Sequence, residues 1–335
     1  DAVNPPTCVV TRQRALEQLP PVSVIIPTIG SNPRLANCVS SVLASDHPRE
    51  RLEIVVVENR PRDSTTKAQL AQLADDRVTY HSTARVGAAH ARNVGTAAAT
   101  GDIVVFFDSD VVVDSQCVSA LAQELIVDAD VATGNVLPLA LDTQAQLLLE
   151  RFGGYGKGFD LRRFRFAETQ GVDRFRAGRL GTGANMAFRR DVLMELGPMC
   201  EFLGPGTPSK SGDDSELLLR ALIQGFRVTY TPAALVWHPS HADENALKSQ
   251  LFGYGAGLSA HLVHLVLEYP KLLVDFVSIL PAILRFFGSG TSTKNSSRGA
   301  DFPIALRMAE LRGVAWGLPA YAKSRASRGL SDGSE

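Results

Sequence analysis

The sequence predicts an α/β protein with a mostly parallel β-sheet flanked by helices, followed by a C-terminal helical extension. Between residues 21 and 110, short β-branched apolar runs alternate with longer stretches of helical pattern. Such alternation is typical of βαβ units, and the nearly continuous apolar runs indicate a parallel sheet buried on both faces. The composition agrees, because 335 residues with 45% hydrophobic and 21% charged residues are enough to build a folded core.

Four strands are predicted in this first part of the chain, with a helix after each of the first three. The strands are expected at residues 22–26, 52–57, 78–81 and 103–107, and the helices at residues 34–45, 64–74 and 87–99. This is a Rossmann-like arrangement, in which ligands bind beyond the carboxyl ends of the strands. The polar residues that leave the strands should therefore face one crevice: Pro27 and Thr28, then Glu58 and Asn59, then Asp108, Ser109 and Asp110.

The second half of the chain has a different pattern. A Gly-rich, basic section at residues 153–179 is followed by Gly181 to Asn185 and by a helical pattern at residues 191–196. Asp213 and Asp214 then open an apolar helix at residues 215–224, where a helix N-terminus stabilises negative charge. A strand at residues 227–231 leads towards His238. We expect this half to complete the site.

Charge and cysteine content exclude several kinds of partner. Lys and Arg number 34 against 35 Asp and Glu, so nothing global attracts the chain to nucleic acid. Cys8, Cys38, Cys117 and Cys200 lie far apart, which predicts reduced structural thiols and neither a zinc site nor a redox pair. Residues 1–20 show no secretory signal, so a cytoplasmic location is expected.

The longest apolar segment, residues 258–287, is not expected to cross a membrane. Glu268, Lys271 and Asp275 interrupt it before it reaches the length that a bilayer requires. The tail that follows is basic among apolar residues. Two interpretations stay open here: helices that close the core of the main domain, or shallow peripheral contact with the cytoplasmic face of an anionic membrane.

The string Asp108-Ser109-Asp110 carries the strongest chemical signal. Two carboxylates on a turn after a buried strand can hold Mg²⁺ or Mn²⁺ and leave positions open for substrate phosphates. The same string also fits the nucleophile motif of haloacid-dehalogenase-type phosphatases, with Asp108 as the nucleophile. Three βα units precede Asp108 here, whereas that family has its nucleophile on the first strand. A non-catalytic carbohydrate-binding protein is a further alternative.

Seven short motifs, spread in order over residues 22–257, resemble family 2 inverting glycosyltransferases of the glycosyltransferase-A fold. They are Val-Ile-Ile-Pro-Thr, Val-Val-Glu-Asn, Ala-Arg-Asn-Val-Gly, Phe-Phe-Asp-Ser-Asp, Gly-Ala-Asn-Met-Ala-Phe, Gly-Asp-Asp-Ser-Glu-Leu and Val-Trp-His. The resemblance implies that Asp108 contacts the ribose or diphosphate of a donor and that Asp110 binds the metal directly. It implies nucleoside or diphosphate contacts for a further set: Pro27, Thr28, Glu58, Asn59, Arg85, Asn93 and Ser109.

The same resemblance implies how the remaining residues act. Inverting transfer needs a carboxylate that accepts the proton of the acceptor hydroxyl. Aligning Gly212-Asp213-Asp214 on the family's Gly-Glu-Asp pattern makes Asp214 the base and Asp213 a supporting acid, with the one-residue register left open. His238 is the implied second metal ligand, and His241 is its weaker rival. Gly183 and Asn185 are implied on the acceptor side, together with Asp213. Arg92 and Asn93 either orient the diphosphate or only pack the loop around it.

The implied reaction moves one sugar from a nucleotide diphosphate donor to a hydroxyl acceptor, with Mn²⁺ or Mg²⁺ as cofactor. A UDP-sugar is the favoured donor, and GDP- or dTDP-sugars stay open because Glu58 stands where the family more often has Asp. The Gln-x-x-Arg-Trp element of processive synthases is absent after Gln250, which favours one transfer per encounter. A glycan, a glycolipid, a lipid-linked sugar or a small molecule fits as acceptor.

These inferences divide the chain into six segments. They are an N-terminal extension (1–20), a nucleotide-sugar-binding half (21–130), an acceptor and catalytic half (131–257), apolar helices (258–287), a flexible linker (288–300) and a basic amphipathic C-terminal segment (301–335).

Overall fold

The structure of the chain is a computed structural model that describes residues 19–30, 32–288, 299 and 301–329. Nearly all of the expected N-terminal extension lies outside the described residues, as do Cys8, most of the expected linker and the last six residues. The other three cysteines, Cys38, Cys117 and Cys200, are buried.

Nine strands in the described part of the chain form a single sheet, in the order β3-β2-β1-β4-β8-β6-β9-β5 with β7 paired to β9. The first four strands are parallel and lie where the sequence predicts them: β1 (Val22–Ile29), β2 (Leu52–Asn59), β3 (Val78–Thr83) and β4 (Ile103–Phe107). The predicted α/β class is confirmed. Strands β1 and β2 run further than predicted, because Thr28 pairs with Glu58 and Ile29 with Asn59 at their carboxyl ends.

The second half of the sheet is mixed. Its strands are β5 (Val112–Val113), β6 (Val131–Pro138), β7 (Arg162–Phe164), β8 (Asn185–Arg189) and β9 (Val228–His238). Strand β8 is antiparallel to both of its neighbours, β4 and β6, whereas β6 and β9 are parallel. The last strand was predicted to end at Thr231, and Pro232, a residue that is rare inside a sheet, follows it. The strand continues because a register shift in the β6–β9 pairing absorbs three residues there and carries β9 on to His238.

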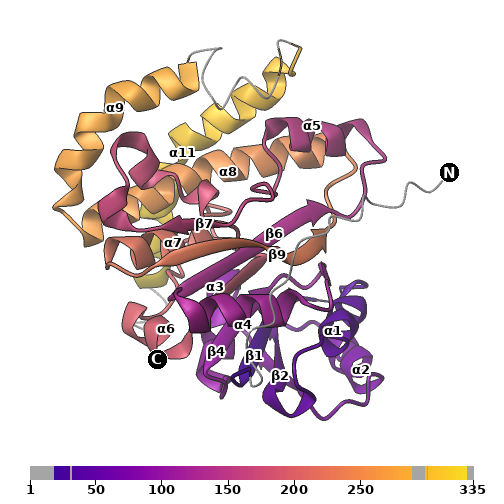
Figure 1. Cartoon of the computed structure of the whole chain (residues 1–335). Helices are drawn as coiled ribbons and strands as arrows, with labels where there is room; N and C mark the ends of the chain where they lie inside the picture. Colours follow the sequence, from indigo (N-terminus) through magenta and orange to yellow (C-terminus); the bar gives the residue numbers. More distant parts are fainter. Residues whose placement is uncertain (1–18, 31, 289–298, 300, 330–335) are drawn as a thin grey trace.

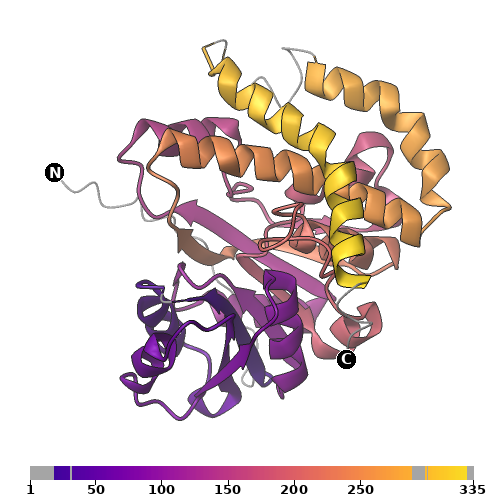
Figure 2. The same cartoon turned by 180° about the vertical axis from the view of Figure 1, so that it is seen from behind.

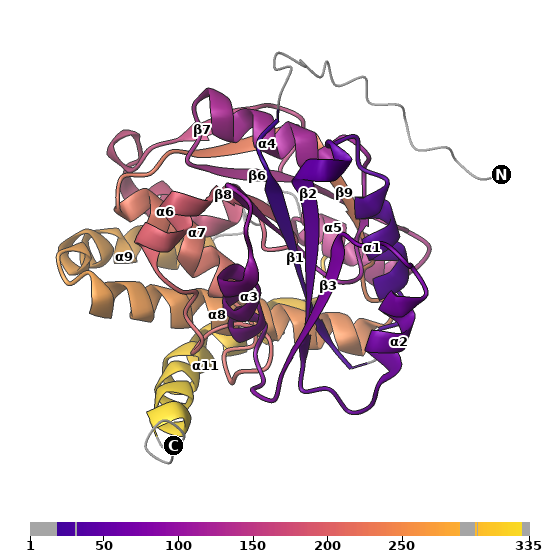
Figure 3. The same cartoon turned by 90° about the horizontal axis from the view of Figure 1, so that it is seen from below.

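Helices cover both faces of the sheet, as Figure 3 shows from below. One core lies under α1 (Leu35–Leu43), α2 (Thr65–Ala71) and α4 (Cys117–Val127). The other lies under α3 (Ala88–Ala98), α6 (Arg190–Leu196) and α7 (Asp213–Ile223). Burial on both sides explains why the first strands read as continuous apolar runs. Short 3₁₀ turns complete the chain: η1 (Arg49–Arg51), η2 (Phe166–Glu168), η3 (Gly171–Phe175) and η4 (Ala177–Arg179).

The remaining helices lie together on one side of the sheet (Figures 1 and 2). They are α5 (Gln144–Phe152), α8 (Glu244–Glu268), α9 (Leu272–Gly288) and α11 (Ile304–Gly329). Helices α8 and α11 touch through their backbones: a Cβ added at Gly255 would lie 2.1 Å from the carbonyl oxygen of Glu310, and one at Gly313 would lie 2.0 Å from that of Phe252. The sequence placed a segment boundary between residues 257 and 258, but helix α8 continues across it. Helix α8 therefore joins the C-terminal helices to the second half of the sheet domain.

None of the helices in the described ranges is long and apolar enough to span a membrane. Apolar side chains of α8, including Leu247, Leu251 and Leu265, are buried, and so is Tyr321 of α11. These contacts show that the C-terminal helices cover the main domain. Their contact with a membrane stays a prediction.

Candidate active site

A cleft of about 1030 Å³ opens at the carboxyl ends of β1, β2 and β4. It lies on the edge of the sheet that a Rossmann-like arrangement predicts for ligands. Helix α7 and the end of β9 close it from the other side. Eleven of the candidate site residues named in the sequence line this cleft: Pro27, Thr28, Asn59, Arg92, Asp108, Ser109 and Asp110 from the first half, and Gly183, Asp213, Asp214 and His238 from the second.

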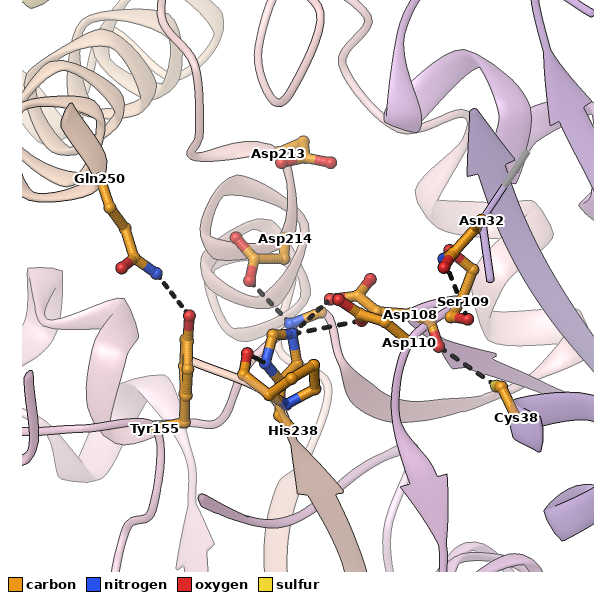
Figure 4. Close-up of polar contacts among 12 residues, drawn as sticks. Asn32, Cys38, Asp108, Ser109, Asp110, Tyr155, Asp213, Asp214, His238 and Gln250 are labelled. Atoms are coloured by element: carbon orange, nitrogen blue, oxygen red, sulfur yellow. Dashed lines mark hydrogen bonds and ion pairs between the residues drawn. The ribbon is translucent and has the colours of Figure 1, made fainter. Parts of the chain in front are cut away.

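Asp108, Asp110 and His238 converge at the floor of the cleft (Figure 4). The Nε2 atom of His238 lies 3.6 Å from Asp110 Oδ1 and 3.8 Å from Asp108 Oδ2. On the other side of the ring, Nδ1 lies 2.7 Å from the carbonyl oxygen of Pro239, to which it donates a hydrogen bond. That bond fixes the orientation of the imidazole and turns Nε2 towards the two carboxylates.

The negative charge of these two aspartates decides what the imidazole binds. Burial lowers the pKa of His238, but the carboxylates of Asp108 and Asp110 outweigh burial and raise it. Burial also raises the pKa of Asp110. Both raised pKa values mean that positive charge is favoured between these side chains. A divalent cation beside Nε2 would supply that charge, as a proton on Nε2 does.

The residues present fit a cation that is completed by oxygen ligands from a substrate. No group of three His, Cys, Asp or Glu side chains in the described ranges forms a metal site unaided. A carboxylate with an imidazole suits Mn²⁺, and Mg²⁺ is usually bound by one or two carboxylates with substrate phosphates. Asp110 and His238 are the residues that would hold it, because Asp108 is already engaged by an arginine.

That arginine is Arg92 of α3, a buried side chain that the sequence left without a defined role. Its Nη2 donates to Asp108 Oδ1 at 2.8 Å, and its Nη1 donates to Asp213 Oδ2 at 2.8 Å. Burial raises the pKa of Asp108, but His238 and Arg92 outweigh burial and lower it, so that carboxylate is held ionised. Arg92 therefore joins the Asp108 turn to the first turn of α7 in one charged network.

Asp213 and Asp214 have different surroundings although they are adjacent. Asp213 is buried beneath Arg92, and burial raises its pKa to about 6. The carboxylate of Asp214 lies at the cleft wall, where its Oδ2 accepts from the backbone N–H of Gly183 at 2.7 Å and its Oδ1 accepts from that of Ser215 at 2.6 Å. The two backbone donors fix the Asp214 carboxylate at the first turn of a helix, where ionised acids are stabilised.

Two other residues that were predicted to contact the nucleotide-sugar donor make hydrogen bonds within the protein itself. Glu58 is buried, and its carboxylate accepts hydrogen bonds from Thr66 Oγ1 at 2.9 Å and from the Tyr80 hydroxyl at 2.6 Å. Asn59 lines the cleft, but its amide exchanges two hydrogen bonds with the backbone of Gly87, at 2.7 and 3.0 Å, and so fixes the start of α3. The proposed nucleoside contact of Glu58 stays a prediction.

Arg85, Asn93 and Asn185 do not line the cleft in the described structure. The Nε atom of Arg85 lies 3.6 Å from Glu201, and Asn93 donates to the same carboxylate at 3.1 Å. Asn185 is fully buried and donates to two backbone carbonyls, those of Asn135 and Ala234, each at 3.1 Å. These side chains support the walls of the site, and their contacts with a ligand stay predictions.

The structure also brings residues into the site that the sequence did not identify. The ring of Tyr155 lies against His238, with centroids 4.8 Å apart. Gln250 of α8 donates to the hydroxyls of Tyr155 at 2.5 Å and Tyr254 at 2.8 Å, and these hydroxyls are 3.0 Å apart. Residues 155 and 250 meet only through tertiary packing, so no local pattern could have indicated this cluster.

Comparison with known proteins finds one matching family model and several similar sequences. The family model described as "Glycosyltransferase like family 2" matches residues 20–252. Relatives include the probable glycosyltransferase YdaM of Bacillus subtilis, 26% identical over 66% of this chain and 51% of YdaM. The glycosyltransferase AglE of Haloferax volcanii is 25% identical over 71% of this chain and 73% of its own. An N-acetylglucosaminyltransferase of Rhizobium meliloti is 29% identical over 65% and 51%. The chain thus spans about half the length of YdaM and of the rhizobial protein.

Solved structures share the fold at low sequence identity. The mannosyltransferase PcManGT from Pyrobaculum calidifontis, solved in complex with GDP-Man and Mn²⁺, superposes with a TM-score of 0.57 at 20% identity, over 94% of this chain and 81% of the other. TarS 1-349 of S. aureus, solved in complex with UDP-GlcNAc, gives a TM-score of 0.54 at 16% identity, over 93% and 92%.

Proposed function

The chain belongs to glycosyltransferase family 2, as its motifs predicted, and on this premise we propose that it transfers one sugar from a nucleotide diphosphate donor to a hydroxyl acceptor with inversion. Family membership removes the haloacid-dehalogenase alternative. The observation that carries the proposal is the arrangement of one cleft, in which the Asp214 carboxylate lies across from Asp108, Asp110 and His238.

We propose that the donor diphosphate binds beside Asp110 and His238 together with Mn²⁺ or Mg²⁺. A bound divalent cation supplies positive charge that stabilises the departing diphosphate. Two solved structures with this fold support the proposed donor and metal, since PcManGT was solved in complex with GDP-Man and Mn²⁺ and TarS 1-349 in complex with UDP-GlcNAc. UDP-sugars remain the favoured donors, with GDP- and dTDP-sugars as alternatives. Pro27 and Thr28 line the same cleft, and we propose that they contact the nucleoside.

We propose Asp214 as the general base. The acceptor oxygen forms a bond to the anomeric carbon from the face opposite the diphosphate, while its proton passes to the Asp214 carboxylate. The bond from the anomeric carbon to the phosphate oxygen breaks, and its electron pair leaves with the nucleoside diphosphate. Two features favour Asp214 over Asp213: its carboxylate lines the cleft in a fixed orientation, and Asp213 is buried under Arg92 with a pKa raised to about 6 by burial.

Transfer of a single sugar per encounter stays part of the proposal, since Gln250 hydrogen-bonds two tyrosines and no Arg-Trp pair follows it. Peripheral membrane contact is also proposed. It is supported by apolar side chains that α9 exposes to solvent, including Leu273, Val274 and Val277. The cytoplasmic location stays a prediction.

Donor and metal binding can be tested by thermal unfolding with a panel of nucleoside diphosphates and sugar nucleotides, with and without Mn²⁺. A ligand that binds the folded state raises its apparent stability, by about 2.7 kcal/mol at a hundredfold excess over Kd. We expect stabilisation by one nucleotide that depends on Mn²⁺ and is lost in Asp110→Ala. Asp102→Asn, at the opposite end of β4, is the matched control. Stabilisation without Mn²⁺ that survives in Asp110→Ala would show that the metal assignment is wrong.

The base can be tested by nucleoside diphosphate release, with alkyl and aryl glycosides as acceptors. Asp214→Asn should bind the donor as the wild type does, while transfer falls by about a hundredfold or more. Asp213→Asn serves as the neighbouring control. Full transfer in Asp214→Asn would contradict the proposal, and loss confined to Asp213→Asn would assign the role to Asp213. Donor binding with no transfer to any acceptor, in wild type and variants alike, would favour a non-catalytic carbohydrate-binding protein.

A further inference from the structure

Two cations face the cleft on its base side, away from the proposed metal site. Lys157 follows α5, and Arg162 begins β7. Neither side chain makes a hydrogen bond or ion pair with another described residue, although both line the cavity. The Arg162 guanidinium lies against Gly158, the residue after Lys157, since a Cβ at Gly158 would lie 3.2 Å from Arg162 Nη2. The positive charge of Arg162 also helps to lower the pKa of Lys157. Two neighbouring cations that no described carboxylate contacts directly favour an anion in the space that they face.

The position of Lys157 indicates which substrate would carry that anion. Burial lowers the pKa of Lys157 to about 8, and the acids that oppose this effect are Asp214 and Glu150. Lys157, Arg162 and Asp214 also line the same cleft, so we assign the anion to the substrate that meets the proposed base. Arg176 and Arg179 line the cleft nearby, and both are within ion-pair distance of Asp173.

The same cavity continues along an apolar wall. Three elements contribute its apolar lining: Leu258 and Leu262 of α8, Ile279 of α9, and Val172 and Phe175 of η3. All of these except Leu258 belong to one hydrophobic cluster. His261 and Glu310 also line the cavity. Helix α9 carries further apolar side chains out to solvent, since Leu273, Val274 and Val277 are 50%, 76% and 52% exposed. A hydrocarbon chain that left the cavity along α9 would therefore stay in contact with apolar surface.

We propose that the acceptor is a hydroxyl-bearing group joined through a phosphate ester to a long hydrocarbon chain, with its phosphate at Lys157 and Arg162, its chain along the apolar wall and its hydroxyl at Asp214. This inference rests on the proposed function, because the accepting hydroxyl must lie at Asp214. Arginine and lysine are the side chains that bind phosphate through charge-assisted hydrogen bonds. The apolar wall favours this class of acceptor over sugar phosphates and other water-soluble phosphates, because those molecules have no hydrocarbon chain that could bind along the wall.

The test uses isothermal titration of the whole chain with Mn²⁺ and its nucleoside diphosphate already bound, so that the donor site is filled. The probes are decyl phosphate below its micelle concentration, inorganic phosphate, and decyl maltoside as a neutral amphiphile. We expect decyl phosphate to bind at least about tenfold more tightly than either of the others. In Lys157→Gln/Arg162→Gln that affinity should fall about tenfold or more, and in Ile279→Asn decyl phosphate alone should weaken. Lys248→Gln, an exposed change on α8, is the control.

Three results would overturn the inference. Equal binding of decyl and inorganic phosphate would show that the apolar wall is not used. Equal binding of decyl maltoside and decyl phosphate, or an unchanged affinity in the double variant, would show that the cations do not select a phosphate. A matching loss of nucleoside diphosphate affinity in the double variant would assign Lys157 and Arg162 to the donor. The proposed function fails separately, when wild type binds no nucleoside diphosphate.

Discussion

Replacing Arg92 by methionine should be among the most destabilising single changes in the described part of the chain. The guanidinium is buried, and it donates 2.8 Å hydrogen bonds to both Asp108 and Asp213. Methionine keeps much of the apolar stem but leaves two carboxylates facing each other without their shared cation. Removing one partner of a buried ion pair typically costs about 3–5 kcal/mol, because the remaining charge is left uncompensated.

This loss can be expressed as a shift in melting temperature. An unfolding entropy of roughly 2.1 cal/mol/K per residue gives about 0.7 kcal/mol/K for 335 residues, so the expected decrease is about 4–7 °C. Arg189→Met is the matched control, since Arg189 pairs with Asp191 at the surface. Exposed pairs contribute about 1 kcal/mol or less. The control should therefore melt within about 1–2 °C of wild type.

The cost should also depend on pH and on Asp213. Burial raises the pKa of Asp213 to about 6 even with Arg92 present, so below that pH the carboxyl is neutral and loses less when Arg92 is removed. Urea unfolding at pH 8 and pH 5 should show a smaller effect of Arg92→Met at pH 5. At pH 8, Asp213→Asn should recover part of the loss. Effects of the two substitutions that add to within about 0.5 kcal/mol would refute the reasoning, because residues in one charged network do not behave independently.

Two further predictions concern the C-terminal helices. Burial lowers the pKa of His261 from 6.5 to about 4. As pH falls below 6.5, the unfolded chain therefore binds a proton at His261 before the folded chain does. The stability that the neutral buried imidazole provides above pH 6.5 is lost as pH falls towards 4. His261→Leu should lose less urea resistance across that range, and equal losses would contradict the assignment. Gly313→Ala should destabilise by about 1–3 kcal/mol, because its Cβ would overlap the Phe252 backbone. At Gly253 a Cβ would have Lys210 Cβ as its nearest neighbour, at 3.4 Å, so Gly253→Ala should instead stabilise the protein by up to about 1 kcal/mol. If the melting temperatures of Gly313→Ala and Gly253→Ala shifted in the same direction, the packing argument would be refuted.

The first part of the fold could be predicted because its signals are local. Strands β1 to β4 are runs of β-branched and aromatic residues separated by helical patterns, and each pattern holds within a few residues. The position of Asp108 and Asp110 after a buried strand follows from the same pattern and from the rule for open parallel sheets. The full length of β9 could not be predicted, because Pro232 reads as an end and only pairing with β6 shows that the strand continues.

Within the site, residue types were visible in the sequence but their partners were not. The sequence identified the acidic pair on α7, yet it could not show that Asp213 is buried under Arg92 while Asp214 faces the cleft. Glu58 and Asn185 carry polar groups that suggested ligand contacts, and both are satisfied by neighbours within the protein.

The sequence alone therefore determined the family, the α/β class and the edge of the sheet at which chemistry is expected. Tertiary structure alone decided which charges meet: Arg92 with residues 16 and 121 positions away, His238 with the Asp108 turn, and Gln250 with Tyr155. The physical reason is that periodicity and strand ends depend on neighbouring residues, whereas an ion pair or buried hydrogen bond depends on how separate elements pack. The unpaired cations Lys157 and Arg162 became visible only once that packing was known.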